Sequence, residues 1–225
     1  MSEDSSRAER LRQARSYLRS ADPVLARLIG DRPAFDPRAW LAQLPPMDLY
    51  GALLFQVTGQ QLSVAATRRT LTRIEALFGG HLPSPAELLG VEPGKLREAG
   101  LSWRKVSTLR DLAGRLSDGR LNADALSRLP DDELMAELTA IPGIGPWTVQ
   151  GALLIALQRE DVVLPGDLAL RKAVQVAYQL DHLPAQQEVL VIAEKWRPYR
   201  SLATSYLFSA AFEPTEAPPV AQRET

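Results

Sequence analysis

Ten residues near the middle of the chain, IPGIGPWTVQ at positions 141–150, constrain its fold more than any other stretch. Gly143 and Gly145 indicate a tight turn, because glycine tolerates positive φ and close approach of another backbone. Pro146 follows directly, and proline is favoured at the first position of a helix. We therefore predict a hairpin of two antiparallel helices joined by this turn.

The rest of the chain carries helical periodicity, with no convincing run of alternating β-branched residues. The residues SPAE at 84–87 are typical of a capping box with proline at the first helical position. We predict an all-α protein with helices at about 6–20, 22–29, 47–58, 62–78, 84–89, 93–99, 102–117, 122–128, 131–140, 146–158, 167–180, 185–196 and 199–211. The polar, proline-rich ends, about 1–5 and 213–225, are expected to be disordered.

Composition excludes several classes of site. The 225 residues include no cysteine and two histidines, which excludes disulfides, cysteine-ligated iron–sulfur clusters and histidine-rich metal sites. The net charge of −1 argues against a protein that coats nucleic acid nonspecifically, because such proteins are usually basic. No apolar run reaches the length of a membrane span, and the N-terminus is too charged for a secretory signal, so we expect a cytoplasmic protein.

Two elements of the chain indicate an enzyme that acts on DNA. The first amides of the helix after Gly145 have no partner within that helix, so a phosphate there would meet N–H donors and a positive helix end. Such backbone contacts position DNA without reading its sequence. Farther along, Asp167 in the stretch LPGDL opens the next helix and places a carboxylate near whatever the hairpin has docked.

These residues carry a resemblance to a known family. The hairpin IPGIGPWT at 141–148, the segment LPGD at 164–167, the loop GQQLS at 59–63 and the stretch WRPYRS at 196–201 resemble the helix–hairpin–helix DNA glycosylases. The likeness is greatest to the bacterial 3-methyladenine DNA glycosylase II group, in its compact form. It implies two helical subdomains, 1–48 with 165–225 and 49–164, with an active-site cleft between them.

The resemblance assigns catalysis to Asp167. Cleavage of an N-glycosidic bond builds oxocarbenium character on deoxyribose. A fixed carboxylate can stabilise that charge or orient a water molecule. A helix N-terminus favours the ionised form of a carboxylate. The alternative role for Asp167 is that of an N-cap residue without a part in catalysis. Trp147 stands where strand-nicking relatives carry a lysine nucleophile, so the enzyme should be monofunctional and leave an abasic site.

The same resemblance implies a substrate pocket lined by Trp147 and Phe208, with core packing as the alternative for both. The indole of Trp147 would suit a cationic alkylated base. Gly151 replaces a large aromatic of one relative, which predicts a more open pocket.

A base must leave the duplex to reach the carboxylate, and a side chain must fill the gap. The resemblance gives this wedge to Gln61 or Leu62, with Gln60 beside them, and it gives the phosphate to Gly143, Gly145 and Thr148. The main-chain carbonyls of Thr139, Ile141 and Ile144 would bind a structural Na⁺ or K⁺. No cofactor for catalysis and no iron–sulfur cluster are expected. Arg104 and Lys105 are expected to add contacts to the DNA backbone.

Four functions fit these observations. The leading one is excision of alkylated bases such as 3-methyladenine and 7-methylguanine in base excision repair. The others are a glycosylase for oxidised or mismatched bases, a hairpin protein that only binds DNA, and an all-α scaffold that docks protein. The expected partner is double-stranded DNA containing a damaged base, with no membrane, and the protein is expected to be a monomer.

Overall fold

The computed structural model describes residues 3–37, 39, 41, 44 and 46–212. Contacts between its Cα atoms divide the chain into two compact units. We call Met1–Leu44 with Glu160–Thr225 the terminal unit and Pro45–Arg159 the central unit. In the part of the chain that is described, no helix has both the length and the apolar character needed to span a membrane.

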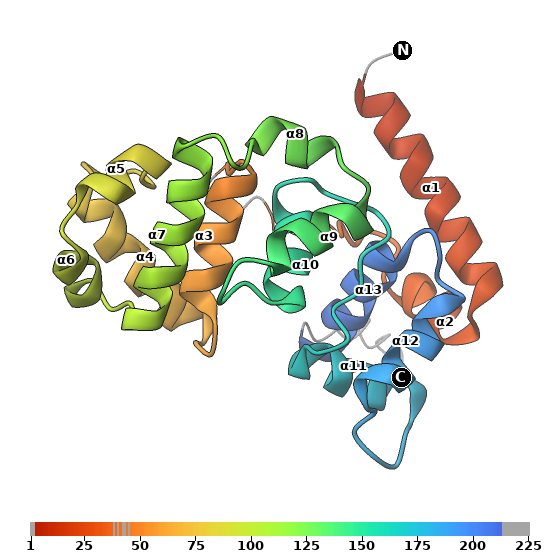
Figure 1. Ribbon diagram of the computed structural model, residues 1–225. Coiled ribbons are helices and arrows are strands. Elements are labelled where there is room, and N and C mark those ends of the chain that lie inside the picture. Colours follow the sequence, from red (N-terminus) through yellow and green to blue (C-terminus); the bar gives the residue numbers. More distant parts are fainter. Residues whose placement is uncertain (1–2, 38, 40, 42–43, 45, 213–225) are drawn as a thin grey trace, which may run out of the picture. The chain divides into compact units, whose positions relative to one another are not determined.

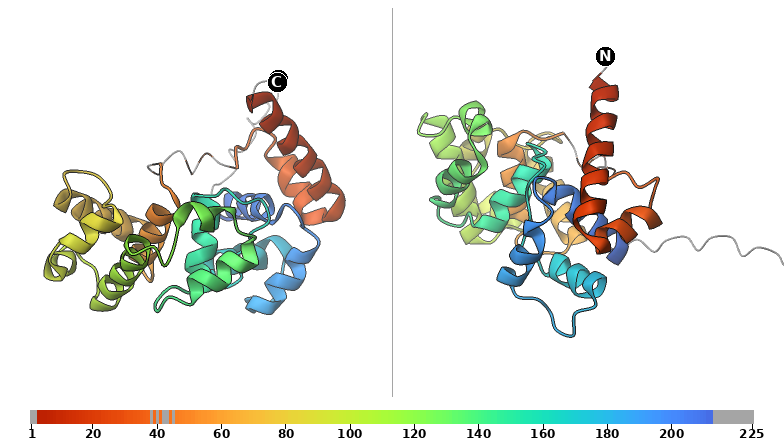
Figure 2. Two further views of the ribbon diagram at one scale, coloured as in Figure 1. Left: turned by 45° about the horizontal axis from the view of Figure 1, so that its top comes forward. Right: turned by 90° about the vertical axis from the view of Figure 1, so that its right-hand side faces the viewer.

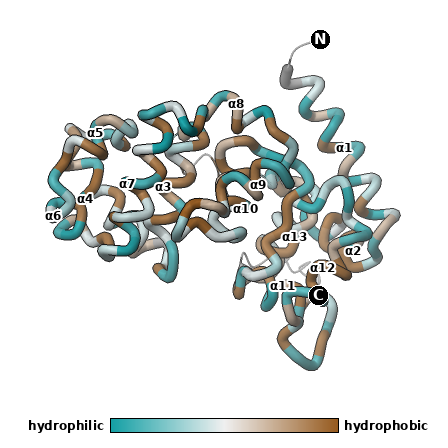
Figure 3. Tube along the Cα trace, viewed as in Figure 1, coloured by the Kyte–Doolittle hydropathy of each residue, from teal (hydrophilic) through white to brown (hydrophobic). Residues whose placement is uncertain are grey.

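The central unit is built around one buried helix (Figure 1). Helix α3 buries nearly all of its residues and packs against α4, α7, α8 and α10. Both α3 and α10 are apolar along most of their length (Figure 3), so each is covered by neighbours within the unit. The helices are α3 (Leu49–Gly59), α4 (Val64–Leu77), α5 (Pro85–Gly90), α6 (Pro93–Glu98), α7 (Trp103–Ser117), α8 (Ala123–Arg128), α9 (Asp131–Thr139) and α10 (Pro146–Ile155).

The terminal unit joins the first and last helices of the chain. Helix α13 packs on both α11 and α2. Helix α1 packs on α2, and these red and orange helices lie together in both views of Figure 2. Trp196 and Tyr206 are fully buried in this unit. Its helices are α1 (Glu3–Ala21), α2 (Pro23–Asp31), α11 (Leu168–Tyr178), α12 (Gln186–Glu194) and α13 (Arg200–Phe212).

Local signals set most helix boundaries. Ser84 and Glu87 form the expected capping box at the start of α5. Gly79, Gly80 and Gly119 have positive φ where helices end, a conformation that glycine adopts without strain. The end of α5 has a capping partner far along the chain, because Arg110 Nη1 donates to the carbonyls of Leu88, Leu89 and Val91.

The all-α prediction is confirmed, and each predicted stretch contains a helix. Helix α10 is shorter than predicted: it ends at Ile155, and the amide of Arg159 returns to the carbonyl of Leu153 while Gln158 has a φ of 47°. Helix α1 begins at Glu3, so residues 3–5 are helical, not disordered, in a segment without glycine or proline. Residues 213–225 lie outside the described part of the chain.

Candidate DNA-contacting and catalytic site

The glycine turn between α9 and α10 is fixed against α7. Gly143 has a φ of 92°, and a Cβ atom added to it would lie 2.0 Å from Oγ1 of Thr108. That hydroxyl donates a hydrogen bond to the carbonyl of Pro142 at 3.0 Å. Ile141 and Ile144 are buried beneath the turn, and the amide of Ile144 donates to the carbonyl of Ile141 at 3.0 Å. Only glycine fits at position 143 without displacing α7 or the turn.

The start of α10 presents main-chain donors. Gly145 is the N-cap residue and has no side chain to cap the helix, and Pro146 has no amide hydrogen. Within the described residues, the amides of Gly143 and Gly145 donate to no backbone or side-chain acceptor. A Cβ atom at Gly145 would meet nothing within 4 Å. Unpaired amides at an uncovered helix N-terminus are the arrangement that favours an anion.

Thr148 faces into the protein. Its amide donates to the carbonyl of Gly145 at 3.0 Å, and its hydroxyl accepts from Nε2 of Gln60 at 2.9 Å. The residue is buried. The structure therefore gives Thr148 a role as a partner of Gln60, while the contact with phosphate expected for it stays a prediction.

The carbonyls expected to bind a monovalent cation belong to the last helical residue of α9, Thr139, and to Ile141 and Ile144 in the turn. The Ile141 carbonyl accepts one hydrogen bond, and a carbonyl oxygen has a second lone pair for a further ligand. The cation site stays a prediction.

In the loop that is expected to enter the DNA base stack, one side chain points into the protein and two are exposed. We call Gly59–Leu62 the wedge turn; the amide of Leu62 donates to the carbonyl of Gly59 at 3.0 Å. Gln61 is exposed and has a φ of 58°, and Leu62 is also exposed. Gln60 turns inward and donates from Nε2 to the carbonyl of Gly143 at 3.0 Å as well as to Thr148. The structure thus brings together Gln60, Gly143 and Thr148, and it leaves Gln61 and Leu62 exposed.

Lys105 donates hydrogen bonds to the protein main chain, and its expected contact with the DNA backbone stays a prediction. Its Nζ donates to the carbonyls of Thr58 and Gln60, each at 2.8 Å. Burial lowers the pKa of this ammonium below its ordinary value. Lys105 is therefore engaged with the protein backbone, whereas its neighbour Arg104 is exposed. The sequence alone could not separate these two cations, because both are compatible with the start of a helix.

The prediction of a more open pocket at Gly151 is wrong. A Cβ atom on Gly151 would lie 2.2 Å from Nε2 of Gln56, so the amide of this buried residue of α3 occupies the space. Trp147, the second residue of α10, is half-buried.

Asp167 belongs to the terminal unit, where it is half-buried at the N-cap of α11. Its Oδ1 accepts a hydrogen bond from the amide of Leu170 at 2.9 Å. The N-cap role is thus present, and the helix holds the carboxylate in a defined orientation. Phe208, on α13 of the same unit, is half-buried.

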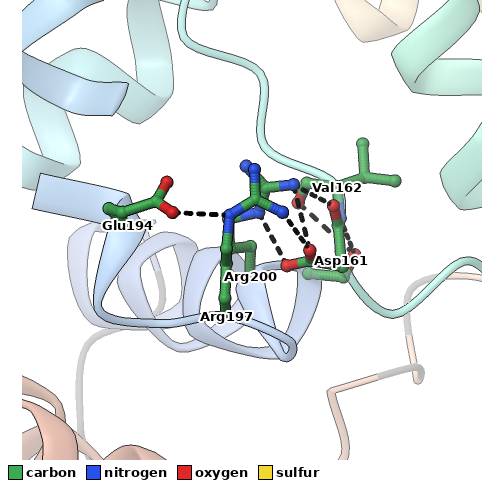
Figure 4. Close-up of polar contacts among 6 residues, drawn as sticks. Asp161, Val162, Glu194, Arg197 and Arg200 are labelled. Carbon is green, nitrogen blue, oxygen red and sulfur yellow. Dashed lines mark hydrogen bonds and ion pairs between the residues drawn. The ribbon is translucent and has the colours of Figure 1, made fainter. Parts of the chain in front are cut away.

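The segment that leads to Asp167 is clamped to the start of α13 (Figure 4). Asp161 accepts from Nε of Arg200 at 2.6 Å and from Nη1 of Arg197 at 2.8 Å. The amide of Ser201 donates to the carbonyl of Glu160 at 2.9 Å, and its hydroxyl accepts from the amide of Val162 at 3.0 Å. The stretch WRPYRS marked these residues, but their partners lie too far along the chain to be identified from sequence.

An all-helical fold with a glycine turn that joins two helices and exposes main-chain amides defines the class of helix–hairpin–helix proteins. The model of one family, the HhH-GPD superfamily of base excision DNA repair proteins, matches residues 56–198. The chain belongs to the HhH-GPD superfamily, the DNA glycosylases of base excision repair.

Similar proteins include 3-methyladenine DNA glycosylases. DNA-3-methyladenine glycosylase 1 of Schizosaccharomyces pombe is 30% identical over 189 residues, which are 83% of this chain and 80% of that protein. Its structure in complex with abasic DNA matches 92% of this chain and 100% of that chain, with 28% identity and a TM-score of 0.81. YfjP of Bacillus subtilis is 28% identical over 180 residues, 77% of this chain and 63% of that protein. The chain therefore spans less than two thirds of the length of YfjP.

Proposed function

We propose that the protein is a monofunctional DNA glycosylase that removes alkylated bases, such as 3-methyladenine and 7-methylguanine, and leaves an abasic site. The observation that carries the proposal is Asp167, whose carboxylate caps α11 in a chain that also has the glycine hairpin. The name of the Schizosaccharomyces pombe relative, DNA-3-methyladenine glycosylase 1, supports the choice of an alkylated purine as substrate.

The proposed chemistry needs a single carboxylate. As the N-glycosidic bond breaks, its electrons leave with the base and positive charge develops at C1′ and the ring oxygen of deoxyribose. The Asp167 carboxylate stabilises this charge, and water then adds to C1′ and releases a proton. An alkylated base that carries a positive charge leaves as a neutral molecule, so it needs no protonation by the enzyme. This difference in leaving group supplies most of the selectivity that we propose.

The hairpin supports the monofunctional proposal. Trp147 occupies the place of the lysine that forms a Schiff base in strand-nicking relatives, and residues 131–155 contain no lysine. Tryptophan cannot form such an intermediate. The half-buried indole of Trp147 instead offers a π-face to a cationic base, which is worth about 0.5–2 kcal/mol.

DNA engagement is assigned to the central unit. The amides of Gly143 and Gly145 would take a phosphate at the start of α10, and the exposed Gln61 or Leu62 would enter the space that a flipped base leaves. A monovalent cation on the carbonyls of Thr139, Ile141 and Ile144 would offset the charge of that phosphate. We expect the partner to be duplex DNA and the protein to act as a monomer.

The test compares the wild type with Asp167→Asn on duplex DNA treated with a methylating agent. We expect the wild type to release free methylated bases while the strands stay intact, and the variant to lose release by at least about 100-fold. DNA affinity, measured by fluorescence anisotropy, should remain within about threefold, because Asn can still cap α11. Release at the wild-type rate by the variant would remove Asp167 from the mechanism. Binding without release by the wild type would contradict the alkylated substrate.

A further inference from the structure

Lys105 holds the wedge turn through hydrogen bonds to its main chain and to the residue before it. Nζ of Lys105 lies 2.8 Å from the carbonyl oxygen of Thr58 and 2.8 Å from that of Gln60. The Gln60 carbonyl belongs to the peptide that leads directly into Gln61. Hydrogen bonds from an ammonium are roughly twice as strong as neutral ones. Lys105 therefore fixes the orientation of the peptide plane immediately before the exposed Gln61.

The backbone of Gln61 needs such support. Its φ of 58° lies in the left-handed region, which costs a residue other than glycine on the order of 1 kcal/mol. A strained backbone of this kind persists only where the surrounding structure holds it. The Gln61 side chain is exposed, so the restraint comes through the backbone on either side. The contact of Lys105 with the Gln60 carbonyl supplies that restraint on one side.

A second contact ties the wedge turn to the glycine turn. The side-chain amide of Gln60 donates to the carbonyl of Gly143 at 3.0 Å and to Oγ1 of Thr148 at 2.9 Å. Thr108, three residues after Lys105 on the same face of α7, donates to the carbonyl of Pro142. Wedge turn, α7 and glycine turn are thus joined pairwise by polar contacts within the central unit.

We propose that Lys105 and Gln60 are positioning residues that hold Gln61 ready for insertion and couple it to the phosphate bound at the glycine turn. The proposal rests on the proposed function and takes Gln61, of the two exposed residues, as the side chain that would replace a flipped base. Lys105 acts through the Gln60 carbonyl, and Gln60 acts through Gly143 and Thr148. A phosphate that stabilises the glycine turn thereby stabilises the inserted position of the wedge.

The competing role for Lys105 is direct contact with a DNA phosphate. Its ammonium already has two main-chain acceptors and its side chain is half-buried, whereas Arg104 beside it is exposed. A cation that contacts phosphate contributes to the salt dependence of binding, with a change in slope of about one per contact. A cation that holds a protein loop does not. The two roles therefore predict different results for Lys105→Met and Arg104→Met.

The experiment uses a duplex with a tetrahydrofuran abasic site opposite 2-aminopurine. The fluorescence of 2-aminopurine reports wedge insertion and requires no excision. We expect Lys105→Met to lower the insertion equilibrium about tenfold while the salt slope of binding stays that of the wild type. Arg104→Met should lower the salt slope by about one and preserve insertion. Lys95→Met, which removes an exposed lysine from α6, serves as the matched charge control and should change neither quantity.

Gln60→Leu gives a second, independent variant that retains the contact of Lys105 with the main chain. It should lower insertion about tenfold and weaken the dependence of insertion on the hairpin phosphate, which is tested by a methylphosphonate at that position. Full insertion by Gln60→Leu or Lys105→Met, or a lower salt slope in Lys105→Met, would overturn the proposal. A wild type that inserts its wedge but releases no methylated base would contradict the proposed function alone.

Discussion

At the scale of single residues, the glycine turn depends on one missing side chain. Gly143 combines a φ of 92° with close approach to Thr108, whereas Gly145, two residues later, has a φ of −102° and open space around it. The two glycines of one motif therefore have different physical roles. The first permits the turn to pack against α7, and the second keeps the helix N-terminus open.

This difference predicts unequal effects on stability. Gly143→Ala should lower the free energy of unfolding by about 1–3 kcal/mol, because alanine disfavours that φ and its Cβ meets Oγ1 of Thr108. Gly145→Ala should change it by less than about 0.5 kcal/mol. Urea denaturation followed by circular dichroism measures both.

A double-mutant cycle with Thr108→Ala checks the cause. If the hydroxyl of Thr108 is the obstacle, Gly143→Ala should cost less in the Thr108→Ala background, with a coupling of at least about 0.5 kcal/mol. Purely additive effects would assign the whole cost to backbone strain. Equal losses for Gly143→Ala and Gly145→Ala would contradict the distinction between the two glycines.

At the scale of elements, the helices could be predicted because their signals are local. The capping box at Ser84 and the glycines of positive φ that end helices each act within a few residues. The early end of α10 could not be predicted in this way. It depends in part on Arg159, whose side chain donates to the carbonyls of Ser127 and Leu129 at the end of α8.

For the candidate site, the sequence predicted which residues take part but not how their side chains contact one another. The motif marked Gln60, Gly143 and Thr148, but not that the amide of Gln60 joins the other two. It gave no sign that Gln56 fills the space beside Gly151, because a facing helix supplies that side chain. Contacts of this kind arise from packing between elements distant in sequence, which no local pattern encodes.

The clamp on the segment before Asp167 gives a prediction at this scale. Arg200 is largely buried and binds both the carboxylate and the main-chain carbonyl of Asp161. Arg200→Met should therefore lower the free energy of unfolding by about 1–3 kcal/mol, since it leaves the partly buried Asp161 without its principal donor. Urea denaturation at neutral pH measures the loss.

Arg197 offers the matched control. It binds the same carboxylate, but its side chain is 49% exposed, and exposed ion pairs contribute at most about 1 kcal/mol. Arg197→Met should therefore cost clearly less than Arg200→Met. A loss from Arg197→Met as large as that from Arg200→Met would show that burial does not govern this clamp.

At the scale of the whole molecule, the two ends of the chain fold together. The terminal unit contains α1 and α2 from one end and α11 to α13 from the other. Asp22, fully buried at the start of α2, connects them: it accepts from Nε1 of Trp196 at 2.9 Å and from the hydroxyl of Tyr178, and it pairs with Nζ of Lys195 at 3.1 Å. One carboxylate thus joins three groups that lie more than 150 residues farther along the chain.

The charge of Asp22 makes this link dependent on pH. Burial by itself would raise the pKa of the carboxyl group, but hydrogen bonds from Tyr178, Trp196 and Lys195 outweigh it and hold the pKa below the ordinary value of 3.8. A carboxyl group whose pKa is lower in the folded state stabilises that state above the unfolded pKa. This contribution is lost as the pH falls through the folded pKa.

Asp22→Asn should therefore lower the free energy of unfolding by about 1–3 kcal/mol at pH 7 and pH 5, because it removes the charge and one acceptor from three donors. The difference from the wild type should shrink below about pH 4, where Asp22 in the unfolded wild-type chain begins to take up a proton. Urea denaturation at pH 7, 5 and 3 measures both proteins, with the exposed Asp124→Asn as a control that should stay within about 0.5 kcal/mol throughout. A difference that persists undiminished at pH 3 would mean that the shape of the side chain, and not its charge, joins the two ends.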